Sequence, residues 1–336
     1  MRLFRTSIAL IAAAVLALSG CSIDQPGSGD GGSDMPGSGA AASGTFPQTV
    51  TTAFGDVEIE KAPQRVVALG WGDAETALAL DVQPVGASDW LGFGGEGVGP
   101  WAKGLYDKAP KLIETLEPSY EAIAALEPDL ILDVRGSGDK ERHDRLDEIA
   151  TTVSIPKGGE NYLTGMEDQV HMISTALGVP EKGDALLKEV DDAYAKAAAD
   201  HPQWKGKTVT AATKTSEGWG AYIAGGGRVE TLERYGFKQN PAIAKLPVNA
   251  GGFSVDISSE KLDVMDADLI VAFPIFLEAT AITKDPQWRK LETVKAGHSV
   301  VIDGDLSNAY SINSPLGALY TVKHLTPLLE KALPAA

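Results

Sequence analysis

The sequence predicts an α/β protein with two similar lobes, mostly parallel sheets, one long bridging helix and a ligand cleft between the lobes. A first observation is that residues 119–132 and 258–271 repeat one pattern, a capped helix followed by a buried strand, at a constant offset of 139 positions. A second is that predicted strands and helices alternate around both copies, which is typical of a parallel sheet. One repeat at this distance indicates two related lobes and not a solenoid, which needs several short repeats.

Each copy of the repeat carries the signals of a helix start. Ser119 and Ser259 are the expected N-caps, and Glu121 and Glu260 lie in the first turn, where a negative charge suits the helix dipole. The aliphatic run that closes each copy predicts a buried strand. We therefore expect the two glutamates at matched positions on the two lobes.

The first lobe is expected over residues 46–160. Its elements alternate, and they are a strand at 65–69, a helix at 73–80, a strand at 83–87, the first copy of the repeat with its strand at 130–134, a helix at 139–149 and a strand at 152–155.

Residues 161–203 interrupt this alternation with two helices. The second, about 20 residues long from Pro180, would measure ~30 Å, which is long enough to bridge two lobes. The second lobe then occupies 204–336. Its further elements are a strand at 208–213, a helix at 228–235, the second copy of the repeat, a strand at 299–303 and a last helix opened by Ser314-Pro315.

The N-terminal segment predicts export and anchoring. Arg2 and Arg5 precede a short apolar stretch, and Leu18-Ser19-Gly20-Cys21 resembles a bacterial lipobox. This resemblance implies a signal peptide over 1–20, lipidation of Cys21 and an extracytoplasmic protein anchored to the cell membrane. The alternative is an ordinary signal peptide with a chance cysteine. Residues 21–45, rich in Gly and Ser, are expected to form a flexible tether.

The composition excludes several classes of function. A single cysteine excludes a disulfide framework, a thiolate zinc site and an iron–sulfur cluster. The net charge of −17 argues against nucleic-acid binding. The five histidines do not cluster, so we expect no direct metal site. The glycine-rich run at 92–97 fits a dinucleotide fingerprint literally but lacks the strand and helix around it, and no catalytic motif is present.

Candidate ligand-binding residues follow from the predicted strand ends, because ligands of open parallel sheets bind beyond the carboxyl ends of the strands. Arg135 is the main candidate, since it ends a buried strand in a glycine-rich turn; a surface pair with Asp139 is the alternative. The full set is Trp71, Trp90, Trp101, Arg135, Tyr162, Lys214, Trp219, Tyr222, Arg228, Phe273 and Tyr310.

Several segments in this order resemble the iron-siderophore and cobalamin branch of ABC-transporter solute-binding proteins. They are Pro63–Leu69, Pro84-Val85-Gly86, the two repeat copies, Val294-Lys295-Ala296-Gly297 and Ser314-Pro315. The resemblance implies two Rossmann-like lobes with a rigid helix hinge, and a monomer. It also implies that Glu121 and Glu260 dock into arginine pockets of a membrane permease.

The expected function is capture of a ferric siderophore and its delivery to an ABC importer, with no catalysis and no cofactor. Cobalamin, haem or a chelate of another metal is the alternative ligand within the class. A secreted α/β enzyme and a sensory or adhesion lipoprotein are the alternatives outside it. The sequence does not identify the siderophore or the permease.

Overall fold

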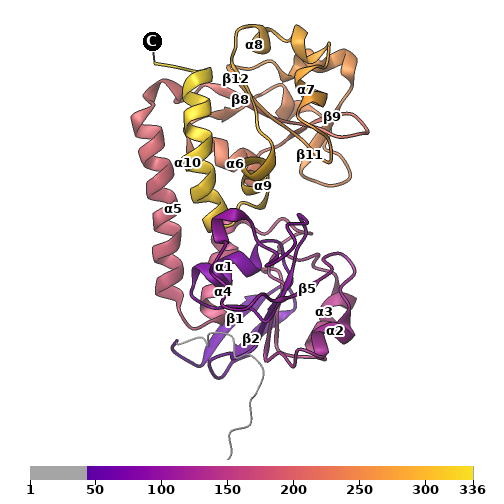
Figure 1. Cartoon of the computed structure of the whole chain (residues 1–336), viewed down its shortest axis with the longest axis vertical. Coiled ribbons are helices and arrows are strands. Elements are labelled where there is room, and N and C mark those ends of the chain that lie inside the picture. The colour runs from indigo at the N-terminus through magenta and orange to yellow at the C-terminus, as the bar shows by residue number, and fades with distance from the viewer. Residues whose placement is uncertain (1–43, 336) are drawn as a thin grey trace, which may run out of the picture. The chain divides into compact units, whose positions relative to one another are not determined.

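The first lobe is built on a five-stranded sheet in which every pairing is parallel (Figure 1). The computed structural model describes residues 44–335, so Cys21, the predicted signal peptide and nearly all of the predicted tether lie outside it. The strand order is β5-β4-β3-β6-β7. The strands are β3 (Val66–Ala68), β4 (Gly86–Ser88), β5 (Lys111–Ile113), β6 (Leu130–Leu132) and β7 (Thr152–Val153). The predicted alternation of strands and helices is confirmed here.

Short helices connect these strands, and one hairpin precedes them. The helices are α1 (Asp73–Ala79), η1 (Pro100–Ala102), α2 (Tyr120–Ala124) and α3 (Lys140–Asp147). The hairpin of β1 (Gln48–Thr52) and β2 (Gly55–Ile59) pairs antiparallel and was not expected from the sequence.

The sheet of the second lobe departs from the expected pattern. Its order is β11-β9-β8-β12-β13, with β10 also paired to β8. The pairings of β8 with β10 and β12, and of β12 with β13, are parallel, but β9 runs antiparallel to both β8 and β11. The strands are β8 (Thr208–Lys214), β9 (Trp219–Tyr222), β10 (Lys238–Gln239), β11 (Ser254–Ile257), β12 (Leu269–Pro274) and β13 (Ser299–Val301).

The antiparallel strand has a local cause. Only residues 215–218 separate β8 from β9, and such a connection is too short for the crossover that a parallel pair needs. Gly218 takes a φ of +151°, and its carbonyl accepts a hydrogen bond from the Thr215 amide, which closes the turn. The glycine between two apolar runs is a hairpin signal that the sequence did contain.

Two longer helices follow the first lobe. They are α4 (Met166–Ala176) and α5 (Pro180–Asp200), and α5 is the predicted bridging helix with 21 residues. It packs against α4, α6 and α10. In the second lobe the helices are η2 (Pro202–Trp204), α6 (Gly227–Arg234), η3 (Ile243–Lys245), η4 (Ser259–Met265), α7 (Thr280–Thr283), η5 (Trp288–Lys290), α8 (Glu292–Lys295), α9 (Gly304–Ile312) and α10 (Pro315–Ala332).

Helix α10 forms a second connection between the lobes. It packs against α5, α9 and β13, and also against α1 and η1 of the first lobe. Figure 1 shows α10 running beside α5. The hydrophobic core is accordingly continuous, because one cluster of buried side chains extends from the first sheet through α4 and α5 to the second sheet and α10.

The two copies of the repeat differ in detail. In the first, Ser119 caps α2 by accepting a hydrogen bond from the Ala122 amide, as predicted. In the second, the residues form a 3₁₀ helix with a kink at Lys261, and Ser258 is the N-cap without a side-chain hydrogen bond. The expected cap at Ser259 is therefore wrong by one residue, and the 139-residue offset from Ser119 in fact leads to Ser258.

Candidate functional site

Three aromatic side chains from separate loops of the first lobe form one stack. Trp71 follows β3, Trp90 follows β4 and Tyr162 precedes α4. The ring centres of Trp71 and Trp90 lie 4.2 Å apart, and those of Trp71 and Tyr162 lie 4.3 Å apart. Both indole Nε1 atoms are buried, and neither has a hydrogen-bond partner within residues 44–335. The stack therefore brings together three predicted ligand-binding residues and leaves two hydrogen-bond donors unused.

Arg135 lies beside this stack and reaches both lobes. Its Nε donates to the Tyr162 carbonyl at 3.4 Å, and its Nη1 donates to the carbonyl of Ile312 at 2.8 Å. Ile312 ends α9, so this bond joins the first lobe to the second. Burial, and then the charge of Arg228, lowers the pKa of Arg135 to about 10, and the side chain stays protonated at neutral pH. The alternative considered from the sequence, a surface pair with Asp139, does not form, and Asp139 caps α3 instead.

In the second lobe, Arg228 lies over a floor of aromatic rings. Its guanidinium carbon is 4.4 Å from the ring centre of Tyr222 and 5.6 Å from that of Phe273. The Tyr310 hydroxyl donates to the Arg228 backbone carbonyl. Tyr222, Phe273 and Tyr310 are all buried, so four predicted ligand-binding residues converge here, with the arginine on top.

Lys214 and Trp219 have other partners. Lys214 forms an ion pair with Asp285, and its Nζ also donates to the Ala281 carbonyl at 3.0 Å. Trp219 is only 3% exposed, stacks on Trp288 at 5.4 Å and packs on the opposite face of the sheet from Tyr222. Since Trp219 offers no free ring face and Lys214 is neutralised, we leave both out of the proposed ligand site.

Trp101 takes part in a contact that the sequence did not reveal. Its Nε1 donates to Glu75 at 2.7 Å, and the Ser314 hydroxyl donates to the same carboxylate oxygen. Glu75 belongs to α1 and Ser314 caps α10, so this cluster is another link between the lobes. Burial raises the pKa of Glu75. Trp101 therefore holds the lobes in position in this structure, and its ring contacts Phe93 and Tyr320.

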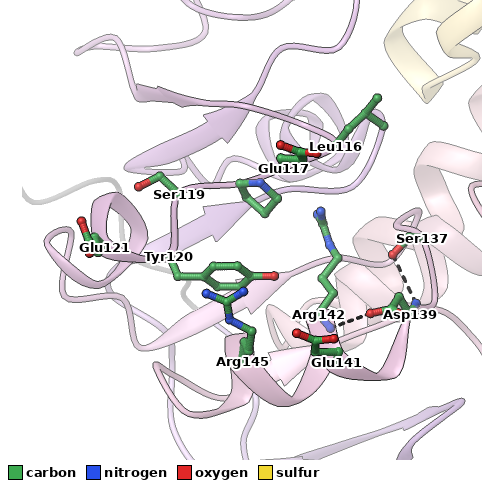
Figure 2. Close-up of a pocket in the computed structure, with 11 residues that line it drawn as sticks. Leu116, Glu117, Ser119, Tyr120, Glu121, Ser137, Asp139, Glu141, Arg142 and Arg145 are labelled. Atoms are coloured by element: carbon green, nitrogen blue, oxygen red, sulfur yellow. Dashed lines mark hydrogen bonds between the residues drawn. The ribbon is translucent and has the colours of Figure 1, made fainter.

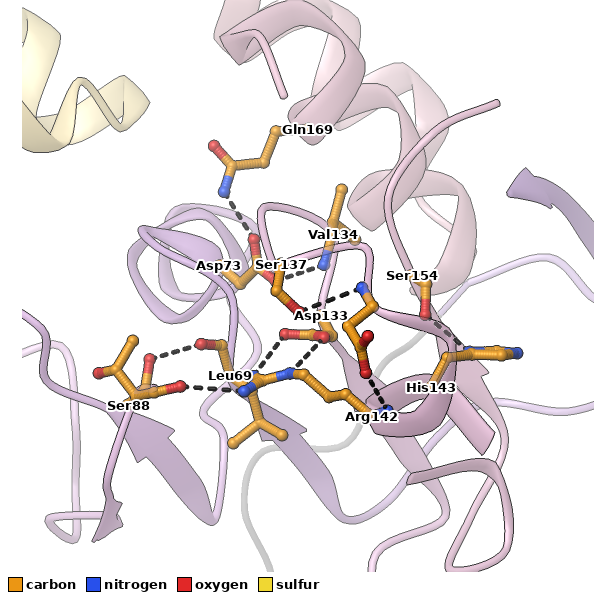
Figure 3. Close-up of polar contacts among 12 residues, drawn as sticks. Leu69, Asp73, Ser88, Asp133, Val134, Ser137, Arg142, His143, Ser154 and Gln169 are labelled. Carbon is orange, nitrogen blue, oxygen red and sulfur yellow. Dashed lines mark hydrogen bonds and ion pairs between the residues drawn. The ribbon is translucent and has the colours of Figure 1, made fainter. Parts of the chain in front are cut away.

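Figure 3 shows buried polar contacts around Asp73 and Asp133 in the first lobe. Asp73 accepts hydrogen bonds from the Gln169 side chain at 2.6 Å and the Val134 amide at 2.8 Å, and burial raises its pKa to about 7. Asp133 receives two hydrogen bonds from Arg142, each 2.9 Å long. The sequence analysis did not predict a role for these residues. A signal was present, because Asp73 and Asp133 each follow an aliphatic run that ends a strand.

The network fixes the loops that carry the site residues. Gln169 also donates to the Trp71 carbonyl at 2.9 Å, and the Trp71 amide donates to the Arg135 carbonyl at 3.1 Å. The aromatic stack and Arg135 are thus held by the same hydrogen bonds.

The two candidate docking glutamates are exposed on their lobes. Glu121 lies at one end of a groove of about 810 Å³ between the start of α2 and α3, and Ser137 and Asp139 lie toward the other end (Figure 2). Within the groove, the Arg145 guanidinium stacks 3.7 Å from the centre of the Tyr120 ring.

The described residues contain neither a metal-binding cluster nor a membrane-spanning helix. Within 44–335, no cluster of three or more His, Cys, Asp or Glu side chains has the arrangement of a metal site. The same part of the chain contains no helix with the length and hydrophobicity to span a membrane.

Comparison with known proteins assigns this chain to a family. A family model described as "Periplasmic binding protein" matches residues 66–306. The chain belongs to this family. As a periplasmic binding protein, it is a member of a family of solute-binding proteins and not of an enzyme family, and its two-lobe fold is shared with solved relatives.

Three relatives illustrate the similarity. "Probable siderophore-binding lipoprotein YfiY" of Bacillus subtilis (strain 168) is 28% identical over 86% of this chain and 87% of its own length. "Fe(3+) dicitrate-binding periplasmic protein FecB" of Escherichia coli (strain K12) is 25% identical over 77% of this chain and 83% of its own. The crystal structure of Streptococcus pneumoniae TIGR4 PiaA in complex with ferrichrome is 28% identical, with a TM-score of 0.72 over 84% of this chain and 98% of that one.

Proposed function

We propose that this periplasmic binding protein captures a ferric chelate of the siderophore type and delivers it to the permease of an ABC importer. The observation that carries the proposal is the similarity, over most of the chain, to relatives whose names specify ferric chelates. The iron arrives as cargo inside the chelate. The protein needs no resident cofactor and performs no catalysis on this proposal.

The arrangement of the predicted cleft residues supports a chelate as ligand. Trp90 and Tyr162 are half-buried and form the two ends of the stack on Trp71, and Arg228 adds a cation above a second aromatic floor. A large ligand with flat apolar parts and polar oxygens fits such a combination, because aromatic faces supply contact area and the cation supplies orientation.

A binding screen tests the proposal. Purified mature protein is titrated with ferric citrate, ferrichrome, a ferric tris-catecholate, cobalamin and haem, and intrinsic tryptophan fluorescence is followed. We expect saturable quenching by at least one ferric chelate, weak binding of cobalamin and haem, and no response to the iron-free chelators at the same concentration. Tight binding of cobalamin or haem with no response to any ferric chelate would overturn the substrate class.

We propose further that Glu121 and Glu260 dock the loaded protein onto the permease. Both side chains are exposed, and both occupy the second position after the N-cap of their helix, at equivalent sites of the two lobes. An exposed carboxylate suits a guanidinium fork on a partner. Uptake by cells that express charge-reversed variants tests this role.

We propose that Cys21 carries a lipid anchor, which keeps the protein at the outer face of the cell membrane. The proposal depends on the Leu18-Ser19-Gly20-Cys21 motif. In cells grown with labelled fatty acid, the wild type is expected to incorporate label and to fractionate with membranes. Cys21→Ala should lose both properties, and label retained in that variant would exclude this site.

A further inference from the structure

Glu75 is a buried carboxylate that has no cationic partner within residues 44–335. It is 1% exposed, and none of the ion pairs in this part of the chain includes it. Burial of a charge without a partner costs free energy unless hydrogen bonds compensate for it. Glu75 accepts three, from the Gly99 amide at 3.2 Å, the Trp101 indole at 2.7 Å and the Ser314 hydroxyl.

These donors come from both lobes. Gly99 and Trp101 belong to the loop between β4 and β5 of the first lobe, whereas Ser314 is the N-cap of α10 in the second. The Ser314 hydroxyl accepts from the Gly317 amide at 3.1 Å while it donates to Glu75. A negative charge at this end of an 18-residue helix also suits the helix dipole. One carboxylate therefore holds the start of α10 and the loop of the first lobe together.

The three neighbours of Glu75 specify a carboxylate and not merely a side chain of its size. Each of them donates, and an ionised carboxylate only accepts. Oε1 faces the Gly99 amide, and Oε2 faces the Trp101 indole. A glutamine would direct its NH₂ group against one of these N–H donors in either orientation. The arrangement consequently depends on the charge of Glu75.

The loop that Glu75 holds also carries part of the aromatic stack. Trp90 lies near its start, and the Phe93 ring meets the Trp101 ring edge-on at 5.7 Å. Four glycines before η1 have positive φ, which lets the chain turn sharply, and they are Gly92, Gly94, Gly95 and Gly97. Residues 89–99 contain no helix or strand, so the position of this loop depends on contacts such as those of Glu75.

The junction of α9 and α10 is held by both lobes at three consecutive residues. The carbonyl of Ile312 accepts from Arg135 of the first lobe at 2.8 Å. Asn313 has a φ of +47°, and its side chain accepts from Thr231 of α6 in the second lobe at 3.4 Å. Ser314 then donates to Glu75. Glu75 and Arg135 thus each bond the first lobe to this junction.

On the basis of the proposed function, we infer that Glu75 is a positioning residue for chelate capture, which couples the loop that carries Trp90 to the α9–α10 junction of the second lobe. Glu75 is buried and contacts no ligand. Its carboxylate keeps the aromatic stack and the second lobe in one binding-competent arrangement. Without it, the lobes adopt other arrangements as well, and the apparent dissociation constant rises in inverse proportion to the competent fraction.

Two measurements on the same variants test this inference. Spin labels at Asp147→Cys in the first lobe and Lys284→Cys in the second, in a Cys21→Ala background, report the distance between the lobes by pulsed electron paramagnetic resonance. Both label sites are exposed, and Cys21 is the one cysteine of the chain. Titration of tryptophan fluorescence gives the dissociation constant of each ferric chelate that the wild type binds.

We expect Glu75→Gln to broaden the distance distribution of the ligand-free protein and to weaken all of these chelates by one common factor of roughly tenfold. This factor should equal the ratio of the competent fractions of wild type and variant, and a saturating chelate should restore the wild-type distance. The thermal midpoint should not fall, because the substitution also removes a buried charge. A purely structural role would lower the midpoint and leave the distances of the folded protein unchanged.

Two further substitutions localise the effect. Glu96→Gln is the matched control, since Glu96 lies in the same loop but accepts only from the Gly104 amide of that loop, at 3.3 Å, and should alter neither distance nor affinity. Ser314→Ala should weaken the chelates as Glu75→Gln does. The double variant should bind no more weakly than the weaker single variant, because both substitutions break the same hydrogen bond.

The outcomes distinguish this inference from the proposed function. A wild type that binds no ferric chelate overturns the proposed function, while the distance measurement still tests whether Glu75 holds the lobes. An unchanged distance distribution in Glu75→Gln overturns the inference. So does a broadened distribution with unchanged affinity, or a loss of affinity that differs between anionic and neutral chelates. In these last three cases, chelate binding by the wild type leaves the proposed function standing.

Discussion

The two lobes share a repeated unit but present different surfaces to the ligand cleft. In the first lobe, the predicted site is a stack of aromatic rings carried on loops after parallel strands. In the second, it is one arginine over a buried aromatic floor, beside a sheet with an antiparallel strand. The exposed glutamates, in contrast, occupy equivalent positions on both lobes. The comparison indicates that the positions of the proposed docking glutamates keep the symmetry of the repeat, whereas the proposed ligand-binding residues of the two lobes have diverged.

The largest effect is expected from breaking the symmetry of the glutamates. Glu121→Arg together with Glu260→Arg should abolish uptake, because two attractive contacts with basic pockets become repulsive. Ligand affinity should stay unchanged, since both side chains are exposed and separate from the cleft residues. Uptake of radiolabelled iron and the dissociation constant are measured in parallel. Glu117→Arg, in the same groove as Glu121, is the control, and normal uptake by the double variant would exclude the docking role.

A second prediction concerns the first lobe alone, where Asp133 and Arg142 form a buried ion pair that has no counterpart in the second lobe's repeat strand. Asp133→Ala should lower the free energy of unfolding by about 3–5 kcal/mol, because Arg142 is left as an uncompensated buried charge. Denaturant unfolding measures this change. The control is Asp144→Ala on α3, the helix that carries Arg142. It removes the exposed pair with Lys140 and should lower the free energy of unfolding by about 0.3–0.5 kcal/mol. Equal effects of the two substitutions would contradict the assignment.

The link between the lobes can be weakened at Arg135. Arg135→Ala removes the donor to the Ile312 carbonyl, and the free energy of unfolding should fall by about 1.5–3 kcal/mol, the range for a hydrogen bond from a charged group. From the sequence, Arg135 was expected to be a ligand contact, and the bond between the lobes adds a structural role. Thermal unfolding at several denaturant concentrations gives the value. An unchanged stability would return Arg135 to the role of a ligand contact without a structural function.

The aromatic wall of the first lobe is probed at its outer ring. Trp90→Ala should weaken binding of a ferric chelate by about 1–2 kcal/mol if one stacking contact is lost. Trp90→Phe should recover part of that affinity, because a smaller ring remains on Trp71. Phe276→Ala, a fully exposed ring of the second lobe, is the control. Affinity that is the same in all three variants would remove Trp90 from the ligand surface.

The smallest effect is expected from Asp73→Asn at acidic pH. Burial raises the pKa of Asp73 from 3.8 to about 7, so the folded state holds a proton that the unfolded chain has already released. The stability contributed by this proton is full below pH 3.8 and declines as the pH rises toward about 7, with a slope near 1.4 kcal/mol per pH unit for one proton.

The asparagine variant should lack this pH dependence and should match the wild type most closely at acidic pH. Its amide can donate to the buried Gln169 Oε1, which has no hydrogen-bond partner in the described chain. Stability curves from pH 4 to 8 for both proteins provide the measurement. Parallel curves across this range would show that another group titrates.

The sequence by itself determined the two-lobe class, the bridging helix and the positions of the glutamates. These features depend on local signals: the helical spacing of apolar residues in α5, the cap at Ser119 and a repeat with a fixed offset. The order of aliphatic runs likewise located most strands, because a buried parallel strand reads as a continuous apolar segment.

Only the tertiary structure decided which side chains of the predicted set have free faces and free donors. Arg135 and Arg228 cannot be ranked from the sequence, because the partner of Arg135 is a backbone carbonyl 177 positions away. Trp219 and Trp90 were both predicted to lie beyond strand ends, yet Trp219 belongs to β9 and is buried against Trp288, whereas Trp90 is half-buried on Trp71. Packing between distant segments sets these contacts. The position of a strand end along the chain does not show which residues its side chains will meet.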